Sequence, residues 1–259
     1  TSADDLYAQL AKRQTGDVTL TARWTANKYT VHFDKNSDEV TGSMNDQTLT
    51  YDKAEKLNAN KFARTGYSFA GWNTKADGSG KSYKDQEEVK NFTTNNGDTV
   101  TLYAQWSINS YKNSIGHWAW GFKNGEGNNV NKRAFNLKDT SFKAKYGETI
   151  VLDDKLATEI PNGFKLTDMG TYVNGNWQRF NLPYSYKQEA EDKYFEYAYD
   201  PIDYNITYNL NGGKNDKENP SKYNVLYGVS LNNPTKEGYT FAGWDDQNDN
   251  KVAGINEGC

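Results

Sequence analysis

The chain has 259 residues, of which 35% are apolar and 14% aromatic, including 19 Tyr and 7 Trp. Its 30 basic and 34 acidic residues are dispersed and give a net charge of −4, which excludes a basic nucleic-acid-binding protein. No apolar run approaches the roughly 18 residues of a membrane span, so we expect no direct membrane insertion. The single cysteine, Cys259, excludes an intrachain disulfide and a cysteine-rich metal site. The aromatic content argues against disorder and for small domains with Tyr and Trp cores.

The first 24 residues predict one helix and one strand. Residues 3–12 have acids in the first turn and Leu6 and Leu10 on one face, which is typical of a short helix. Residues 18–24, Val-Thr-Leu-Thr-Ala-Arg-Trp, alternate apolar and polar side chains and predict a strand with one buried face. The first five residues lack Met, a basic region and an apolar region, so we expect an internal piece of a longer protein.

Two seven-residue runs, 66–72 and 238–244, read Gly-Tyr-Ser/Thr-Phe-Ala-Gly-Trp and differ at a single position. The two-residue period of a strand places the Tyr and the Phe on one face. The second Gly lets the backbone bend so that the Trp folds into the same core. Stacking of a ligand on these rings is the alternative, but a motif repeated in each module favours a module core. The predicted core motif is Tyr67, Phe69, Trp72, Tyr239, Phe241 and Trp244.

Other strands recur at matching places. The run 18–24 has a twin at 100–106, Val-Thr-Leu-Tyr-Ala-Gln-Trp. A strand start at 29–33 returns at 204–210, where it leads into an Asn-Gly-Gly turn. We therefore divide the chain into the C-terminal part of a preceding repeat (1–24), a complete repeat (25–106), a middle unit (107–200) and a repeat that stops before its last strand (201–259).

The combined series of motifs resembles the Listeria–Bacteroides repeat, also known as the internalin-type B repeat. The resemblance covers 25–106, 202–259 and the strand 18–24. It implies small β-grasp (ubiquitin-like) modules, carried in tandem on bacterial cell-surface or secreted proteins, with roles in adhesion or as spacers. The expected fold class is mainly β with short helices (α+β), and short links between modules favour an elongated, semi-rigid array.

The middle unit departs from the repeat pattern. Residues 107–200 keep Tyr111, Tyr146-Gly147 and a closing strand at 194–199, but the Gly-Tyr-x-Phe-Ala-Gly-Trp motif is absent. Asn174-Gly175 is a favourable hairpin turn. We interpret the unit as a diverged repeat of the same fold, and an inserted β-domain is the alternative.

The sequence offers little material for catalysis. Neither His32, expected to be exposed on a strand, nor His117 has a second histidine or a cysteine at zinc-binding spacing. Nucleophilic triads have no candidate, although 34 acids leave paired-carboxylate chemistry open. The runs 245–250 and 124–129 suggest calcium and anion loops, but both lack the residues that complete such sites. We expect no enzyme, no cofactor and no metal site.

Aromatic residues are dense in the middle unit, and this is its most distinctive feature. Sheet faces rich in aromatic rings bind sugars or peptide side chains. The alternative is that these rings replace the core motif, in which case they should be buried. The candidate ligand-binding aromatics are Trp118, Trp120, Tyr172 and Trp177.

The predicted function is that of a non-catalytic repeat region, acting as spacer or stalk and as an adhesion or host-interaction module. The alternative is a carbohydrate- or peptide-binding module centred on 107–200. A host protein or glycan is the expected partner. We expect a monomer at the bacterial cell surface or outside the cell, as part of a longer chain.

Overall fold

A computed structural model describes residues 2–13, 16–17, 19–119, 122–123, 129–130, 135–157 and 159–255. Contacts divide the chain into two compact units: unit 1 comprises 1–64 and 69–107, and unit 2 comprises 65–68 and 108–259. The described residues are mainly β, as predicted. No helix among them is both long and apolar enough to cross a membrane.

The N-terminal helix is confirmed, but the strand after it is not. Helix α1 spans Ala3–Arg13. In the predicted strand 18–24, the described residues 19–24 form no ladder, and Leu20 and Trp24 are 66% and 91% exposed. The expectation of a strand with a buried face was wrong here, because a strand needs a neighbour to satisfy its backbone groups.

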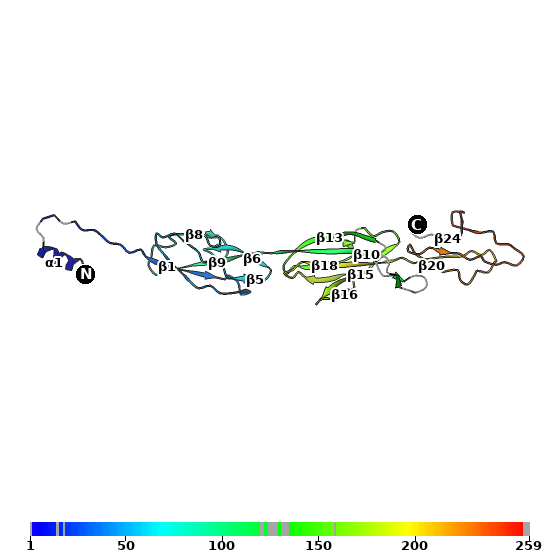
Figure 1. Cartoon of the computed structure of the whole chain (residues 1–259), viewed down its shortest axis with the longest axis horizontal. Coiled ribbons are helices and arrows are strands. Elements are labelled where there is room, and N and C mark those ends of the chain that lie inside the picture. The colour runs from blue at the N-terminus through cyan, green and yellow to red at the C-terminus, as the bar shows by residue number, and fades with distance from the viewer. Residues whose placement is uncertain are drawn as a thin grey trace. The chain divides into compact units, whose positions relative to one another are not determined.

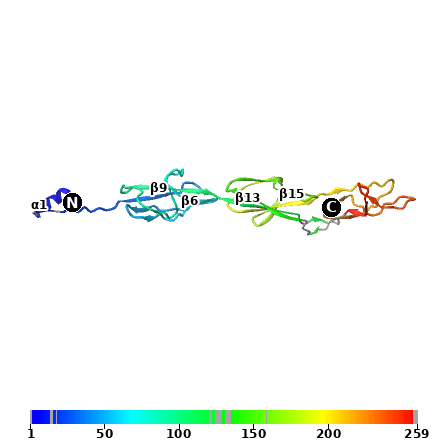
Figure 2. The same ribbon diagram turned by 90° about the horizontal axis from the view of Figure 1, so that it is seen from above.

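Unit 1 is organised around a five-stranded sheet of order β3-β1-β9-β6-β7. Strand β1 is antiparallel to β3 and parallel to β9, and β6 and β9 lie side by side (Figure 1 and Figure 2). The five strands are β1 (Lys28–Asp34), β3 (Gln47–Thr50), β6 (Tyr67–Asn73), β7 (Ser82–Tyr83) and β9 (Thr99–Ile108). Two short pairs complete the unit: β2 (Val40–Thr41) with β5 (Ala63–Arg64), and β4 (Glu55–Lys56) with β8 (Glu88–Val89).

Trp72 lies at the centre of the core of unit 1 and is 0% exposed. Its ring packs against Phe33 and Phe69, with centroid distances of 4.8 and 4.9 Å. Gly71 precedes it with φ 123°, and a Cβ there would meet the carbonyl oxygen of Tyr83 at 2.7 Å. Only glycine combines this backbone angle with such a close approach. It therefore allows β6 to turn its Trp inward.

Unit 2 contains a second five-stranded sheet, of order β13-β10-β18-β15-β16. The connections match those of unit 1, because β10 is antiparallel to β13 and parallel to β18. The strands are β10 (Ser110–Ala119), β13 (Phe135–Lys145), β15 (Phe164–Val173), β16 (Asn176–Phe180) and β18 (Lys193–Pro201). Beside them lie β11 (Phe122–Lys123) with β12 (Asn129–Val130), β14 (Thr149–Leu152) with β17 (Tyr184–Lys187), and a 3-10 turn, η1 (Asp154–Leu156).

The core of unit 2 is aromatic and includes a buried histidine. Phe195, Tyr197 and Tyr199 point inward from alternate positions of β18. His117 is 4% exposed, with Nδ1 2.7 Å from the Tyr199 hydroxyl and Nε2 2.7 Å from Thr140 Oγ1. Both ring nitrogens therefore have protein partners.

Residues 202–255 carry only two-residue strands. These are β19 (Tyr204–Asn205), β20 (Lys222–Tyr223), β21 (Val229–Ser230), β22 (Trp244–Asp245), β23 (Lys251–Val252) and β24 (Gly254–Ile255). Of these described residues, only Leu226 joins a buried cluster, in the core of unit 2. In the run considered as a calcium loop, Asp246 Oδ1 instead accepts backbone N–H groups of Asn248 and Asn250 at 2.8 and 2.9 Å, which makes it a turn.

Candidate functional site

The structure brings two of the four candidate aromatics together. Tyr172 on β15 stands directly opposite Trp177 on β16, and their rings meet edge to face with centroids 5.1 Å apart. They are 63% and 40% exposed. The side chain of Trp118, which lies in β10, and the whole of Trp120 fall outside the described residues. The pair therefore places two large rings on one solvent-facing surface.

Local sequence explains why these rings face solvent. The turn Asn174-Gly175 has φ 50° and 77°, which is the tight two-residue hairpin geometry predicted for it. Strand alternation then sends Met169 and Thr171 to the buried side and Tyr172 to the other. Gly170 makes room for the neighbouring ring, because a Cβ there would meet Trp177 Cζ2 at 2.1 Å. The indole thus lies against the bare backbone of β15.

Polar groups surround the two rings. Arg179 Nη2 donates to Asp168 Oδ1 at 2.7 Å. The register pairs Gly170 with Arg179 on one side and with Glu196 on the other. Tyr194, 39% exposed, donates its hydroxyl to Glu196 Oε1 at 3.4 Å. We call the following set the aromatic face: Asp168, Tyr172, Trp177, Arg179, Tyr194 and Glu196.

The aromatic face has a mixed electrostatic character. Burial raises the pKa of Glu196, the hydrogen bond from Tyr194 opposes this rise, and the negative charge of Asp139 adds a smaller increase. The hydrogen bond to Asp168 raises the pKa of Arg179, although partial burial opposes it. The surface therefore presents the Arg179 guanidinium, which has further N–H donors besides the one bound to Asp168. It also presents the Glu196 carboxyl, which keeps its proton to a higher pH than usual because its pKa is raised.

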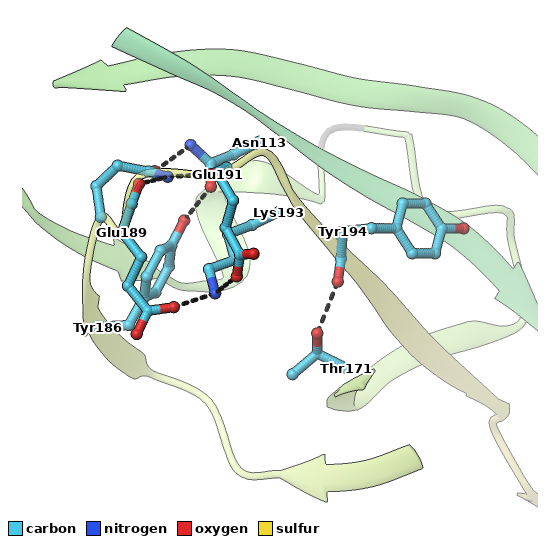
Figure 3. A network of polar contacts seen from close by, with 8 residues as sticks. Asn113, Thr171, Tyr186, Glu189, Glu191, Lys193 and Tyr194 are labelled. Carbon is cyan, nitrogen blue, oxygen red and sulfur yellow. Dashed lines mark hydrogen bonds and ion pairs between the residues drawn. The ribbon is translucent and has the colours of Figure 1, made fainter. Parts of the chain in front are cut away.

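A buried polar network holds the start of β18, which carries Tyr194 (Figure 3). Asn113 Nδ2 donates to Gln188 Oε1 at 2.7 Å, and the Tyr186 hydroxyl donates to Asn113 Oδ1 at 2.6 Å. Gln188 Nε2 donates to the carbonyls of Glu189 and Glu191. The network fixes the loop before β18, while the Tyr194 ring points away from it (Figure 3).

Four residues of the aromatic face, Asp168, Arg179, Tyr194 and Glu196, were not among the candidates predicted from the sequence. Tyr194 and Glu196 alternate with buried Phe195 in the predicted closing strand, so the two-residue period already places both on the outer side. The Arg179–Asp168 pair gives no such signal. The ladder shifts register between Leu166 and Asp168, and a shift of this kind cannot be read from spacing.

The residues predicted as core motif occupy different environments in the two copies. In the first copy, Trp72 is fully buried and Phe69 packs against the core of unit 1. Tyr67 of the same copy belongs to unit 2, where it lies edge to face with Tyr146. In unit 2, Phe241 and Trp244 are half-buried. Tyr239 was expected in the core but is 72% exposed, with the Lys236 ammonium 4.5 Å from its ring centroid. This difference arises because residues 204–255 form no continuous sheet to cover it.

Charged side chains elsewhere in the described part of the chain do not form a metal centre. Among the described residues, no group of three or more His, Cys, Asp or Glu side chains gathers closely enough to hold an ion. His32 is exposed, as predicted, and its Nδ1 lies 2.7 Å from Asp46 Oδ1. The run 124–128 of the suggested anion loop lies outside the described residues.

Two relatives from one organism and one solved structure match parts of this chain. A protein of Evansella cellulosilytica with the provisional name of Gly-rich membrane protein is 28% identical over 234 residues, covering 88% of this chain and 23% of its own length. A second, provisionally named membrane protein from the same organism is 36% identical over 97 residues, 37% of this chain and 14% of its own length. The chain thus spans less than a quarter of either relative. A type 2 repeat of the mucus binding protein MUB from Lactobacillus reuteri matches 68% of this chain and 100% of its own, with 9% identity and a TM-score of 0.17.

The family comparison agrees with the repeats read from the sequence. The Listeria–Bacteroides repeat domain matches residues 29–105 and 204–255. These two segments contain both copies of the Gly-Tyr-Ser/Thr-Phe-Ala-Gly-Trp run. The chain therefore belongs to the Listeria–Bacteroides repeat family, through these two segments.

Proposed function

We propose that this chain is a non-catalytic region of a bacterial surface or secreted protein, in which the repeats act as spacers and the unit 107–200 acts as an adhesion module. The proposed ligand class is a carbohydrate. Family membership supports the spacer role, and the names of the two relatives favour a place at the cell envelope. The aromatic face supports the binding role.

The observation that carries the proposal is the exposure of Tyr172 and Trp177 on a unit whose core is complete without them. Ile115, Met169, Phe195, Tyr197 and Tyr199 are each at most 2% exposed. Rings needed for the core would be buried, whereas a binding module shows two or more together at the surface. Large exposed rings in contact cost solubility, so a ligand explains their position better than stability does.

The polar rim favours a carbohydrate over an apolar peptide. A sugar presents C–H groups on one face, which suit the flat indole of Trp177, and hydroxyls at its edge, which need donors and acceptors. Arg179, Asp168 and Glu196 supply both within the same surface. An apolar peptide would remove these polar groups from water and offer no hydrogen bonds to their remaining donors and acceptors, which is unfavourable.

We also propose that 107–200 is a diverged repeat and that 25–106 and 107–200 both have the β-grasp fold. The shared sheet order supports this, since each unit has a hairpin, a central parallel pair and a second hairpin in the same arrangement. In this proposal the buried tyrosines of β18 fill the core in place of the rings of the lost motif. A repeat whose core no longer needs that motif can acquire a different surface.

The test is a glycan microarray probed with the full chain, labelled through Cys259, its only cysteine. We expect selective binding by the wild type and a loss of roughly tenfold or more in affinity for Trp177→Ala. The control is Tyr7→Ala, because Tyr7 is 79% exposed on α1, far in sequence from the face. It should bind as the wild type does.

A second variant tests whether the position of the Trp177 ring matters for binding, in addition to its presence. Gly170→Ala keeps Trp177 but displaces its indole, so glycan binding should fall while the unit stays folded. If no glycan binds, or if Trp177→Ala binds as well as the wild type, the proposed function is wrong. Binding of peptides but no glycans would overturn the ligand class.

A further inference from the structure

Two lysines stand directly opposite each other on the five-stranded sheet of unit 2. The register pairs Lys112 of β10 with Lys143 of β13, and both side chains are exposed. Their neighbours Asn113 and Ala144 are buried, so strand alternation sends both lysines to the solvent-facing side of the sheet. Like charges directly opposite each other destabilise an antiparallel pair. We call Lys112 and Lys143 the lysine pair.

Neither ammonium group of the lysine pair forms an ion pair with a carboxylate in the described part of the chain. Asp192 Oδ1 accepts the backbone N–H of Lys112 at 2.8 Å, not its ammonium. Lys193, in contrast, is held by the carboxylates of Glu189 and Glu191 (Figure 3). Both ammonium groups of the lysine pair therefore have donors available to a ligand.

The lysine pair borders the aromatic face. By the register, the rings of Tyr194, Tyr172 and Trp177 follow one another across β18, β15 and β16, and we call them the ring row. On its other side, Tyr194 pairs with Ser114 of β10. Ser114 lies two residues after Lys112 on the same face of the strand, which is roughly 7 Å along β10. A lysine side chain covers this distance with its flexible stem.

The opposite border of the ring row is acidic. Glu196 lies two residues after Tyr194 on the same face of β18, and Asp139 is close enough for its charge to act on the Glu196 carboxyl. Farther along this border, Asp168 binds Arg179. A ligand on the rings therefore meets two ammonium groups on one side and mainly carboxyl groups on the other. The two borders distinguish the two edges of a sugar chain.

We propose that the carbohydrate bound by the aromatic face is acidic, with carboxylate or sulfate groups that bind the lysine pair while its rings stack on the ring row. This inference rests on the proposed function and narrows its ligand class. An anion between the two ammonium groups would offset their repulsion, which explains why Lys112 and Lys143 are opposite each other. Because the other border carries carboxyl groups, the ligand should bear its anionic groups along one edge only.

The size and charge of the surface fit such a ligand. Strands β10 and β16 are three strand spacings apart, roughly 14 Å, so a ligand that reaches both the lysine pair and Trp177 contains more than one sugar unit. The net charge of −4 does not prevent this contact, because physiological salt screens charges beyond about 8 Å.

Calorimetric titration of the full chain tests the inference. The probes are tetramers of glucose, galactose and N-acetylglucosamine, each prepared neutral, oxidised to the carboxylate at the primary hydroxyl, and sulfated at that hydroxyl. We expect a charged form to bind roughly tenfold or more tightly than its neutral parent at low salt, because the added contacts are charge-assisted. The preference should shrink as salt is added. The tighter of the two charged forms identifies the anion as carboxylate or sulfate.

The lysine variant, Lys112→Gln with Lys143→Gln, keeps two polar side chains and removes both charges. Its dissociation constant for the charged tetramers should rise roughly tenfold or more, while the weaker binding of the neutral tetramers stays the same. Its unfolding midpoint should stay the same or rise, because the repulsion is gone. The matched control is Lys61→Gln with Lys75→Gln, which removes the same charge at exposed positions of unit 1 and should bind as the wild type does.

The outcomes separate this inference from the proposed function. Trp177→Ala should weaken the binding of neutral and charged tetramers alike. Binding that depends on Trp177 but favours neutral tetramers would overturn the acidic ligand and leave the proposed function intact. Unchanged affinity for charged tetramers in the lysine variant, or a lower unfolding midpoint, would overturn the binding role of the lysine pair. Absence of binding to every tetramer would contradict both proposals.

Discussion

Trp72 and Trp177 show how one residue type takes opposite roles in this chain. Trp72 is enclosed by Phe33 and Phe69 and is 0% exposed, and burial of about 200 Å² is worth roughly 5 kcal/mol before entropy is subtracted. Trp177 lies on Gly170 and remains 40% exposed. A glycine accounts for each position. The backbone angle of Gly71 lets Trp72 turn into the core, whereas the missing Cβ of Gly170 lets the Trp177 ring pack on the outer surface of β15.

His117 should make unit 2 sensitive to acid. Burial lowers its pKa below the ordinary 6.5, against a smaller raising effect of Asp139. The unfolded state therefore binds the proton first, so the stabilising contribution is complete above pH 6.5 and is lost as the pH falls below it. The slope is at most about 1.4 kcal/mol per pH unit. Amide exchange of β10 and β18 between pH 7.5 and 5.5 measures it.

The variant His117→Gln removes the titration while keeping a donor and an acceptor for Thr140 and Tyr199. Its exchange should depend less on pH than that of the wild type. His32→Gln is the control, because that histidine is exposed, and it should behave as the wild type does. Equal pH dependence in wild type and His117→Gln would show that buried His117 is not the sensor.

At the scale of elements, the hairpins and the closing strands could be predicted from sequence. Asn174-Gly175 fixed one turn, and alternation identified β1, β9 and β18. The segment 18–24 could not be judged this way, because it alternates as a strand does but none of the described residues pairs with 19–24. Sequence patterns report which face a strand would bury, but pairing depends on residues far away along the chain.

The polar network that closes unit 2 was also beyond sequence reasoning, and it yields a test. Asn113 is 0% exposed and bonds both Gln188 and Tyr186. Asn113→Ala leaves those two groups without this partner in a buried place, which costs about 1–3 kcal/mol. Faster amide exchange in β10 and β18 would register the loss. Asn181→Ala, at an exposed position, should change little, and equal exchange in both variants would contradict a stabilising network.

At the scale of the molecule, the two segments of the repeat family flank a region with a different surface. Both segments that belong to the repeat family carry the Gly-Tyr-Ser/Thr-Phe-Ala-Gly-Trp motif, which contributes to a buried core in the first of them. The region between them lacks the motif and exposes Tyr172 and Trp177 instead. The sequence indicated this aromatic density but could not tell core from surface, because Tyr186, Tyr197 and Tyr199 could equally have been the exposed rings.

The most direct test of the central claim is the indole N–H signal of Trp177 in a nuclear magnetic resonance titration with the best glycan from the array. We expect the Trp177 signal to shift in proportion to occupancy, while that of buried Trp72 stays unchanged. Saturation at the affinity measured on the array would place the sugar on the aromatic face. A Trp177 signal that stays still while the glycan binds would place the site elsewhere and contradict the account.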